Sequence, residues 1–99
     1  MGVELMNWRN ELVEKVNLLD REIARNEEKL KLLYSKIKVA EESKKLFKRE
    51  SDIEEYIQTK FVGKYDADYA DLEKQIEEML KERRVSIGMI DVLKSHGIE

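Results

Sequence analysis

Few residues in this chain have the type and spacing that chemistry requires, and His96 is the first to consider. It is the only histidine and stands beside Gly97 near the end of the chain. A metal or catalytic site built on an imidazole needs further ligands or a base nearby, and the sequence places none beside His96. A cation is favoured at the C-terminus of a helix, and this structural role accounts for His96 better.

Paired carboxylates are the second candidate for chemistry. Glu54 with Glu55 and Asp66 with Asp68 could bind a divalent ion. No acidic stretch has the twelve-residue calcium spacing with a central glycine and a final glutamate, so helix capping explains these pairs better. The chain also holds no cysteine. We therefore expect no metal, no cofactor and no catalytic residue; an unrecognised helical-bundle enzyme is only the third hypothesis for function.

Clustered cations are the third candidate, because Lys and Arg side chains release counterions from nucleic-acid phosphates. The candidate phosphate contacts lie close together in the sequence: Lys44, Lys45, Lys48 and Arg49. Acidic residues interrupt this stretch at Glu41, Glu42 and Glu50. Nucleic-acid binding is therefore the alternative hypothesis rather than the first.

An apolar stripe at 3,4 spacing dominates the first half of the chain and must position any such site. It consists of Leu12, Val16, Leu19, Ile23, Asn26, Leu30, Leu33, Ile37 and Ala40. This spacing keeps one seam of an α-helix apolar over many turns, and the seam can leave water only against another helix. The stripe predicts one long amphipathic helix that needs a helical partner.

Composition supports an all-α chain. Of the 99 residues, 41% are charged and 41% hydrophobic, and proline is absent, which is typical of long solvated helices. The first 50 residues carry 12 basic and 10 acidic side chains, whereas the remainder carries 7 and 12. This asymmetry favours packing of the second half back on the first helix, or antiparallel docking of two copies. Charge pairs such as Glu11 with Lys15 and Glu27 with Lys31 indicate a solvated outer face.

The predicted architecture is a long N-terminal amphipathic helix with two or three shorter helices packing back on it as a coiled-coil-like bundle. We treat the chain as a single helical domain, 1–99. Its predicted helices cover about 4–48, 52–61, 67–84 and 87–96. Ser51 with Glu54 predicts a capping box, Asp66 or Asp68 a third helix start and Ser86 a fourth, while Gly97 marks a helix end in a left-handed residue.

One short motif resembles a known family. Residues 19–23, Leu-Asp-Arg-Glu-Ile, look like a segment in the first helix of the all-helical chorismate mutases, which share the helical layout. Aligned on Asp20, the family's substrate-binding cations fall on Val13, Leu30 and Glu41 here, and the next basic position falls on Ile53. A dicarboxylate substrate needs paired basic groups, so the activity is not expected.

The leading hypothesis is a non-enzymatic helical interaction protein, such as a small adaptor, inhibitor or assembly factor, that self-associates, with a homodimer preferred over a hetero-oligomer. The predicted self-association residues are Val16, Leu19, Ile23, Asn26, Leu30, Leu33 and Ile37. Asn26 either pairs with its counterpart across a two-fold axis or lies where the seam opens to solvent. The predicted face for a further protein partner is Met79, Met89, Val92 and Leu93, because flexible methionines adapt to grooves, although core packing is the alternative for each.

The remaining expectations concern the chain's surroundings. The longest apolar runs are two or three residues, so no membrane association is predicted. The N-terminus lacks a basic start followed by an apolar block, and a cytoplasmic location is predicted. Met6 is an alternative natural start, although Leu5 fits the stripe. Trp8, at helical spacing from Leu5 and Leu12, is predicted to be a core anchor rather than a recognition residue.

Overall fold

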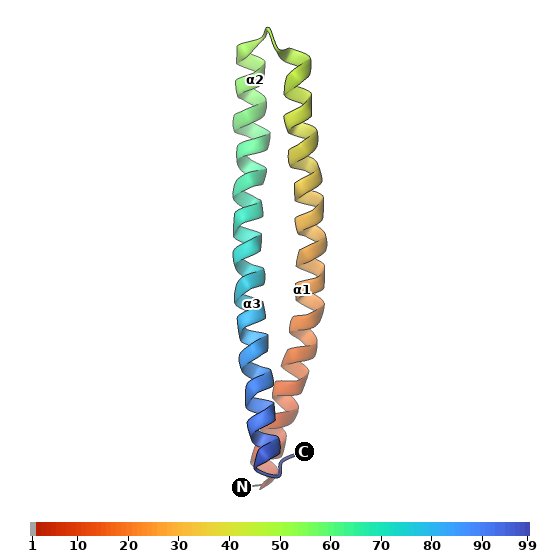
Figure 1. Cartoon of the computed structure of the whole chain (residues 1–99), viewed down its shortest axis with the longest axis vertical. Helices are drawn as coiled ribbons and strands as arrows, with labels where there is room; N and C mark the ends of the chain where they lie inside the picture. The colour runs from red at the N-terminus through yellow and green to blue at the C-terminus, as the bar shows by residue number, and fades with distance from the viewer. Residues whose placement is uncertain (1) are drawn as a thin grey trace. The chain divides into compact units, whose positions relative to one another are not determined.

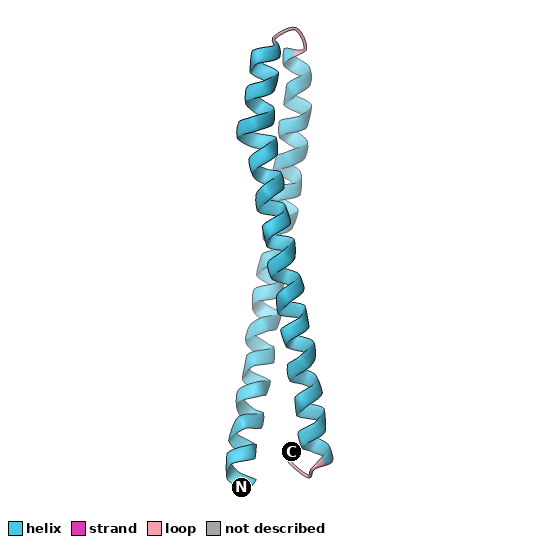
Figure 2. Cartoon of the chain, turned by 90° about the vertical axis from the view of Figure 1, so that its left-hand side faces the viewer, coloured by secondary structure: helices cyan, strands magenta, loops and turns pink. Residues whose placement is uncertain are grey.

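A computed structural model describes residues 2–99, and it is helical almost throughout (Figure 1). The elements in chain order are α1 (Gly2–Lys44), the 3₁₀ helix η1 (Lys45–Phe47), α2 (Ser51–Ile57), the π-helix η2 (Gln58–Val62) and α3 (Gly63–Ser95). Within residues 2–99, loops lie only at the connection after η1 and at the C-terminal end (Figure 2). The all-α prediction is confirmed, and no strand occurs among residues 2–99.

The described chain divides into two compact units. The terminal unit comprises Met1–Arg25 and Ile76–Glu99, and the central unit comprises Asn26–Gln75. In each unit a segment of α1 lies beside an antiparallel segment from the second half of the chain. The predicted return of the second half onto the long helix is therefore present within each unit.

The second half of the chain carries a stripe that matches the one on α1. Residues spaced alternately three and four apart are all buried or half-buried on α3: Tyr65, Tyr69, Leu72, Ile76, Met79, Arg83, Ser86, Ile90 and Leu93. On α1 every residue of the predicted stripe, Leu12 to Ala40, is likewise buried or half-buried. Two such seams facing each other give coiled-coil packing of antiparallel helices in each unit.

Helix α3 differs from the prediction in its length. The predicted helices 67–84 and 87–96 form one helix that begins at Gly63 and ends at Ser95. Ser86 lies in its interior and is 3% exposed, so it does not cap a new helix. The apolar stripe lapses in the sequence because Arg83 and Ser86 occupy seam positions, but a polar residue in a seam does not break the helix.

The start of the second half also differs from the prediction. The turn after η1 is present, but the N-cap position of α2 is Glu50 and no side chain caps the helix there, so the Ser51–Glu54 capping box does not form. The Glu50 carbonyl instead accepts hydrogen bonds from the Ile53 and Glu54 amides at 3.0 Å each. Because α2, η2 and α3 follow one another directly, Asp66 and Asp68 lie inside a helix and start none.

The helical end at Gly97 is confirmed. Gly97 has φ +82°, a left-handed conformation that glycine adopts without steric cost. The Ile98 amide donates to the Leu93 carbonyl and the Gly97 amide to the Lys94 carbonyl, both at 3.0 Å. These two bonds form the Schellman motif that satisfies the last carbonyls of a helix.

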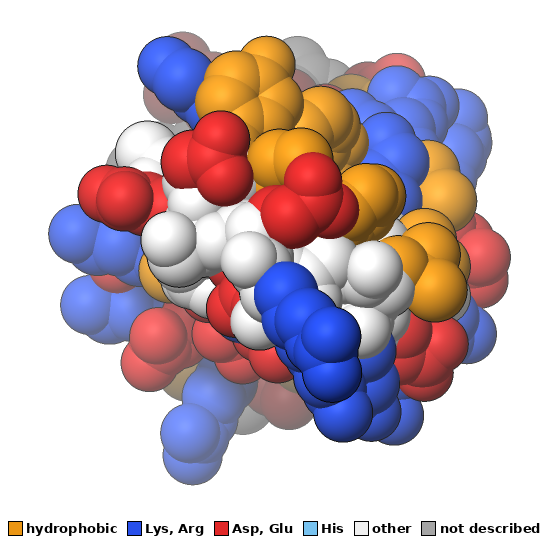
Figure 3. Space-filling view, turned by 90° about the horizontal axis from the view of Figure 1, so that it is seen from above, with side chains coloured by type: hydrophobic (Ala, Val, Ile, Leu, Met, Phe, Trp, Pro, Cys, Tyr) orange, Lys and Arg blue, Asp and Glu red, His pale blue; other side chains and the backbone are white. Residues whose placement is uncertain are grey.

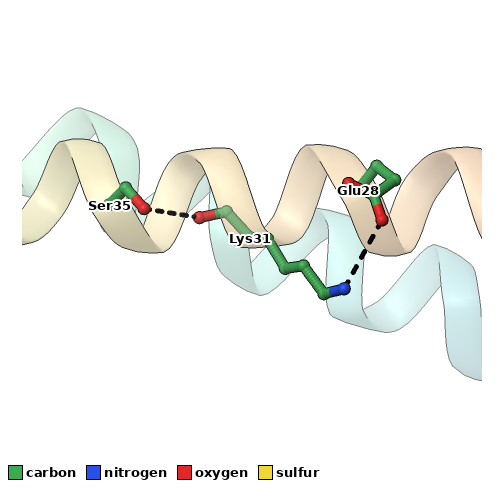
Figure 4. A network of polar contacts seen from close by, with 3 residues as sticks. All are labelled: Glu28, Lys31 and Ser35. Carbon is green, nitrogen blue, oxygen red and sulfur yellow. Dashed lines mark hydrogen bonds and ion pairs between the residues drawn. The ribbon is translucent and has the colours of Figure 1, made fainter.

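The outer face of α1 is solvated, with a different pairing from the predicted one. Lys31 pairs with Glu28 at 3.4 Å rather than with Glu27, and the Ser35 hydroxyl donates to the Lys31 carbonyl at 3.1 Å (Figure 4). Lys15 pairs with Glu82 of α3 at 2.6 Å rather than with Glu11. The Lys15 ion pair therefore joins the two helical segments of the terminal unit.

Candidate functional site

The residues predicted for self-association lie in the seams inside the two units. In the terminal unit Leu19 and Ile23 are each 7% exposed and Val16 is half-buried. In the central unit the other four members, Asn26, Leu30, Leu33 and Ile37, are all half-buried. Much of the partner surface that the stripe needs is therefore supplied by the chain itself, and the use of these residues between copies stays a prediction.

An open apolar groove lies on the central unit, beside the seam. It has a volume of about 500 Å³ and is lined by Leu32, Ser35, Lys36, Val39, Ala40, Ser43, Ile57, Phe61 and Tyr65. Three of its large hydrophobic side chains are exposed: Val39 by 67%, Leu32 by 57% and Phe61 by 41%. Large side chains of this type are normally covered when they cluster, so the groove is a candidate binding surface.

The α1 wall of the groove follows from helical spacing. Leu32, Lys36, Val39 and Ser43 succeed one another at steps of four, three and four, which keeps them on one flank of the helix. These flank residues lie beside the seam residues Leu33 and Ile37 and are not part of the seam. The seam is therefore buried inside the unit, while the flank remains accessible.

The π-helix η2 builds the opposite wall. The buried residues Ile57 and Val62 are five positions apart instead of three or four, and a π-turn absorbs the extra residue within a continuous helical path. Val62 is then 1% exposed in a small core with Ala40 and Ile57, while the preceding Phe61 reaches the groove. The Phe61 ring meets the rings of Tyr56 and Tyr65 edge-on, at centroid distances of 6.2 and 6.3 Å.

A second hollow extends this surface and has charged walls. It has a volume of about 410 Å³ and shares Leu32 and Lys36 with the apolar groove. Its lining is Lys29, Leu32, Leu33, Lys36, Asp68, Asp71, Leu72 and Gln75. The cations come from α1 and the carboxylates from α3, so the surface has a basic wall, an acidic wall and leucines between them. We call the two hollows together the central groove.

The terminal unit has its own hollow, of about 520 Å³, on which Trp8, Val85 and Met89 are exposed by 42%, 51% and 42%. The prediction that Trp8 is a core anchor is wrong, because its side chain lines this open surface. Val85 was not predicted from the sequence as a surface residue. A signal was present, since Val85, Met89 and Val92 repeat at steps of four and three along one flank of α3.

The predicted partner face does not form one surface. Met89 and Val92 are exposed by 42% and 58%, but Leu93 is 6% exposed and belongs to the seam. Met79 is half-buried, also at a seam position. Seam and flank residues alternate along α3, and the four predicted residues include members of both sets.

The predicted phosphate contacts gather at the tip of the central unit, at the end of α1 and in the turn that follows. Lys44 donates to the Gln58 side-chain oxygen at 2.6 Å, while Lys45, Lys48 and Arg49 are exposed. Figure 3 looks onto this tip from above and shows basic and acidic side chains around it, with hydrophobic side chains gathered on one side. The cationic tip is therefore small and mixed with carboxylates.

No constellation for metal binding accompanies these surfaces. Among residues 2–99, no group of three or more His, Asp or Glu side chains could hold a metal ion. His96 is exposed in the turn that follows α3. Within the same described range, no helix has the length and apolar character needed to cross a membrane.

Comparison with known proteins adds no functional assignment. No protein-family model, curated protein sequence or solved structure matches the chain. A function for this chain is therefore proposed from the geometry of the grooves and the charges around them.

Proposed function

We propose that this chain is a non-enzymatic helical interaction module that self-associates through its central groove, and that the dimer acts as an adaptor, inhibitor or assembly factor for another protein. The observation that carries the proposal is the apolar groove on the central unit, on which Leu32, Val39 and Phe61 are exposed by 41% to 67%. A second copy of the chain is the expected occupant.

The energetics favour covering this surface. Full burial of a Val, Leu or Phe side chain is worth about 1.5–3 kcal/mol relative to leaving it exposed. Two antiparallel helices can bury only the faces that they turn toward each other, which leaves their flanks in water. Four-helix packing covers those flanks, and two helical hairpins can supply the four helices.

The interface differs from the one proposed on the sequence. The seam residues Leu30, Leu33 and Ile37 are half-buried inside the central unit, so a second copy would contact mainly the flank beside them. Val39 is the most exposed apolar residue of that flank. It is therefore the position at which association and folding can be separated.

The test is mass in solution by light scattering, over a concentration series, for the wild type and for Val39→Glu. We expect a dimer for the wild type and a monomer of unchanged helicity for the variant, because a buried glutamate at this site would lose its hydration in the dimer. Leu46→Glu is the matched control, since Leu46 is 80% exposed and does not line the groove.

The control variant should remain dimeric. A wild type that stays monomeric at every concentration would overturn the proposal, and so would equal dissociation of both variants. Circular dichroism of each variant separates loss of association from loss of folding.

A second surface suits a different protein partner. The hollow of the terminal unit exposes Trp8, Val85 and Met89, and an aromatic ring with a flexible methionine is typical of surfaces that bind apolar groups. In this proposal self-association uses the central unit and the partner binds the terminal unit. Loss of binding to an identified partner on Trp8→Ala, with the dimer intact, would support the division.

Nucleic-acid binding is the second candidate function, and the observation that favours it is the gathering of Lys44, Lys45, Lys48 and Arg49 at one tip. Retention on DNA that falls steeply with salt and is lost in Lys48→Glu/Arg49→Glu would support it. The carboxylates around the same tip weigh against it.

The proposed cytoplasmic location would be tested by microscopy of a tagged chain.

A further inference from the structure

The two walls of the central groove carry opposite charges that the chain leaves without ion-pair partners. Lys29 and Lys36 lie on the α1 wall, and Asp68 and Asp71 lie on the α3 wall. All four side chains are exposed, and within residues 2–99 none of them forms an ion pair. Lys36 instead places its ammonium 5.6 Å from the centre of the Tyr65 ring.

We propose that the occupant of the central groove is a second copy in the same direction, so that the α1 wall of each central unit lies on the α3 wall of the other and both tips lie at the same end. This inference rests on the proposed self-association and adds its geometry. It assigns Lys36 to Asp68 of the second copy and Lys29 to Asp71 of the second copy.

Symmetry leaves two ways to place groove against groove. A two-fold axis parallel to the helices puts α1 of one copy on α3 of the other, with both tips at one end. A two-fold axis across the helices, in the plane of the interface, puts α1 on α1 and α3 on α3, with the tips at opposite ends. The first brings basic walls onto acidic walls, and the second brings like charges together.

The first arrangement also matches the charges in height. All four residues line one hollow, and α1 and α3 run antiparallel there, so Lys36 and Asp68 lie toward the tip and Lys29 and Asp71 lie away from it. Rotation about an axis parallel to the helices does not change height along the helices. Each cation therefore faces a carboxylate of the other copy at its own level, and the symmetry repeats each pair.

The charges select the direction, and the apolar floor supplies the attraction. Leu32, Val39 and Phe61 would be covered in either direction, so they do not distinguish the two arrangements. Like charges placed together weaken an interface and opposite charges fix its register. Because the four groups are exposed, the preference should be strongest at low salt.

Inter-label distance measures the direction directly. The chain has no cysteine, so Arg49→Cys gives a single attachment site for a spin label at the exposed tip. Same-direction docking places the two labels within about 30 Å, because neighbouring helices lie 8–10 Å apart. Opposite-direction docking places them about 40 Å or more apart, at 1.5 Å per residue from the middle of the groove to the tip.

Charge reversal tests the assigned pairs. We expect Lys36→Glu or Asp68→Lys alone to weaken self-association about five- to tenfold at low salt, and Lys36→Glu/Asp68→Lys to restore it, because the pair reforms with its signs exchanged. Lys31→Glu is the control, since Lys31 pairs with Glu28 along α1 and does not line the central groove (Figure 4). Helicity is followed for every variant.

The outcomes separate this inference from the proposed function. A dimer with a short label distance and with recovery in the double variant supports both. A dimer with a long label distance, or with single reversals that change nothing, overturns the direction but leaves self-association standing. A wild type that is monomeric at every concentration overturns both.

Discussion

The terminal and central units have the same architecture of two antiparallel helical segments, yet they distribute their apolar side chains differently. The terminal unit buries five hydrophobic residues below 9% exposure, Leu12, Leu19, Ile23, Ile76 and Leu93. The central unit buries three, Ala40, Ile57 and Val62, and these form one cluster near its tip. The more deeply buried seam indicates greater internal stability of the terminal unit. Both units also expose apolar side chains beside the seam, Trp8, Val85 and Met89 in the terminal unit and Leu32, Val39 and Phe61 in the central unit.

Ion pairs follow the same division. Two of them join the helices of the terminal unit, Lys15 with Glu82 and Asp20 with Arg83. In the central unit the ion pair present, Glu28 with Lys31, lies along one helix. Cations and carboxylates that line the central groove therefore remain available to a second copy.

The largest expected effect separates seam from flank in the terminal unit, at two adjacent leucines. Leu19 is 7% exposed and Leu18 is 52% exposed. Leu19→Ala should lower the free energy of unfolding by about 2–5 kcal/mol, because it removes buried methyl groups and leaves a cavity. Leu18→Ala should change it by no more than about 0.5 kcal/mol.

Urea unfolding followed by circular dichroism, at one fixed protein concentration, measures both variants. Similar losses for the two leucines would show that the flank at Leu18 is covered too. That result would extend the association surface to the terminal unit and remove the contrast between the units.

A smaller effect compares one glycine of each unit. Gly88 lies inside α3 with no atom within 4 Å of the position that a Cβ would take, so Gly88→Ala should stabilise the terminal unit by about 1 kcal/mol through helix propensity. Gly63 follows the π-helix, and a Cβ there would lie 3.2 Å from the Gln58 carbonyl oxygen. Gly63→Ala should therefore gain little or lose stability.

Thermal and urea denaturation of the two variants checks this difference. An equal gain at both positions would mean that the π-helix relaxes to accept the methyl group. The extra residue between Ile57 and Val62 would then not constrain the wall of the groove.

The sequence predicts the seams of this fold better than its interruptions. The stripe from Leu12 to Ala40 reads clearly because each member is apolar or small, except Asn26. Arg83 and Ser86 are polar although both keep seam spacing, and the sequence predicts one helix to about residue 84 and another from about residue 87. A polar seam residue and a helix end look alike in sequence, and only the packing of the facing segment distinguishes them.

The candidate site was harder to predict than the fold, for a geometric reason. The five-residue step from Ile57 to Val62 is visible in the sequence, but a helix that ends at about residue 61, as predicted, accounts for it equally well. Which flank stays open depends on how α1 and α3 face each other. Leu32, Val39 and Phe61 form one surface because α1 and the segment η2 lie side by side, and the sequence alone does not show this arrangement.

The smallest expected effect concerns the ion pairs. Lys15 and Glu82 are 47% and 48% exposed, so Glu82→Gln should lower the free energy of unfolding by only about 0.2–1 kcal/mol at low salt. At about 1 M salt the Debye length is about 3 Å and the difference should largely vanish. Glu28→Gln is the matched control, since its pair with Lys31 is 3.4 Å long and about three-quarters exposed, and we expect no measurable change.

A salt-sensitive loss at Glu82 and none at Glu28 would mean that charge joins the helices of the terminal unit. Equal changes in the free energy of unfolding for Glu82→Gln and Glu28→Gln would mean that the seams alone hold the two helical segments of each unit together. Electrostatics would then act mainly at the charged walls of the central groove, where it selects a partner.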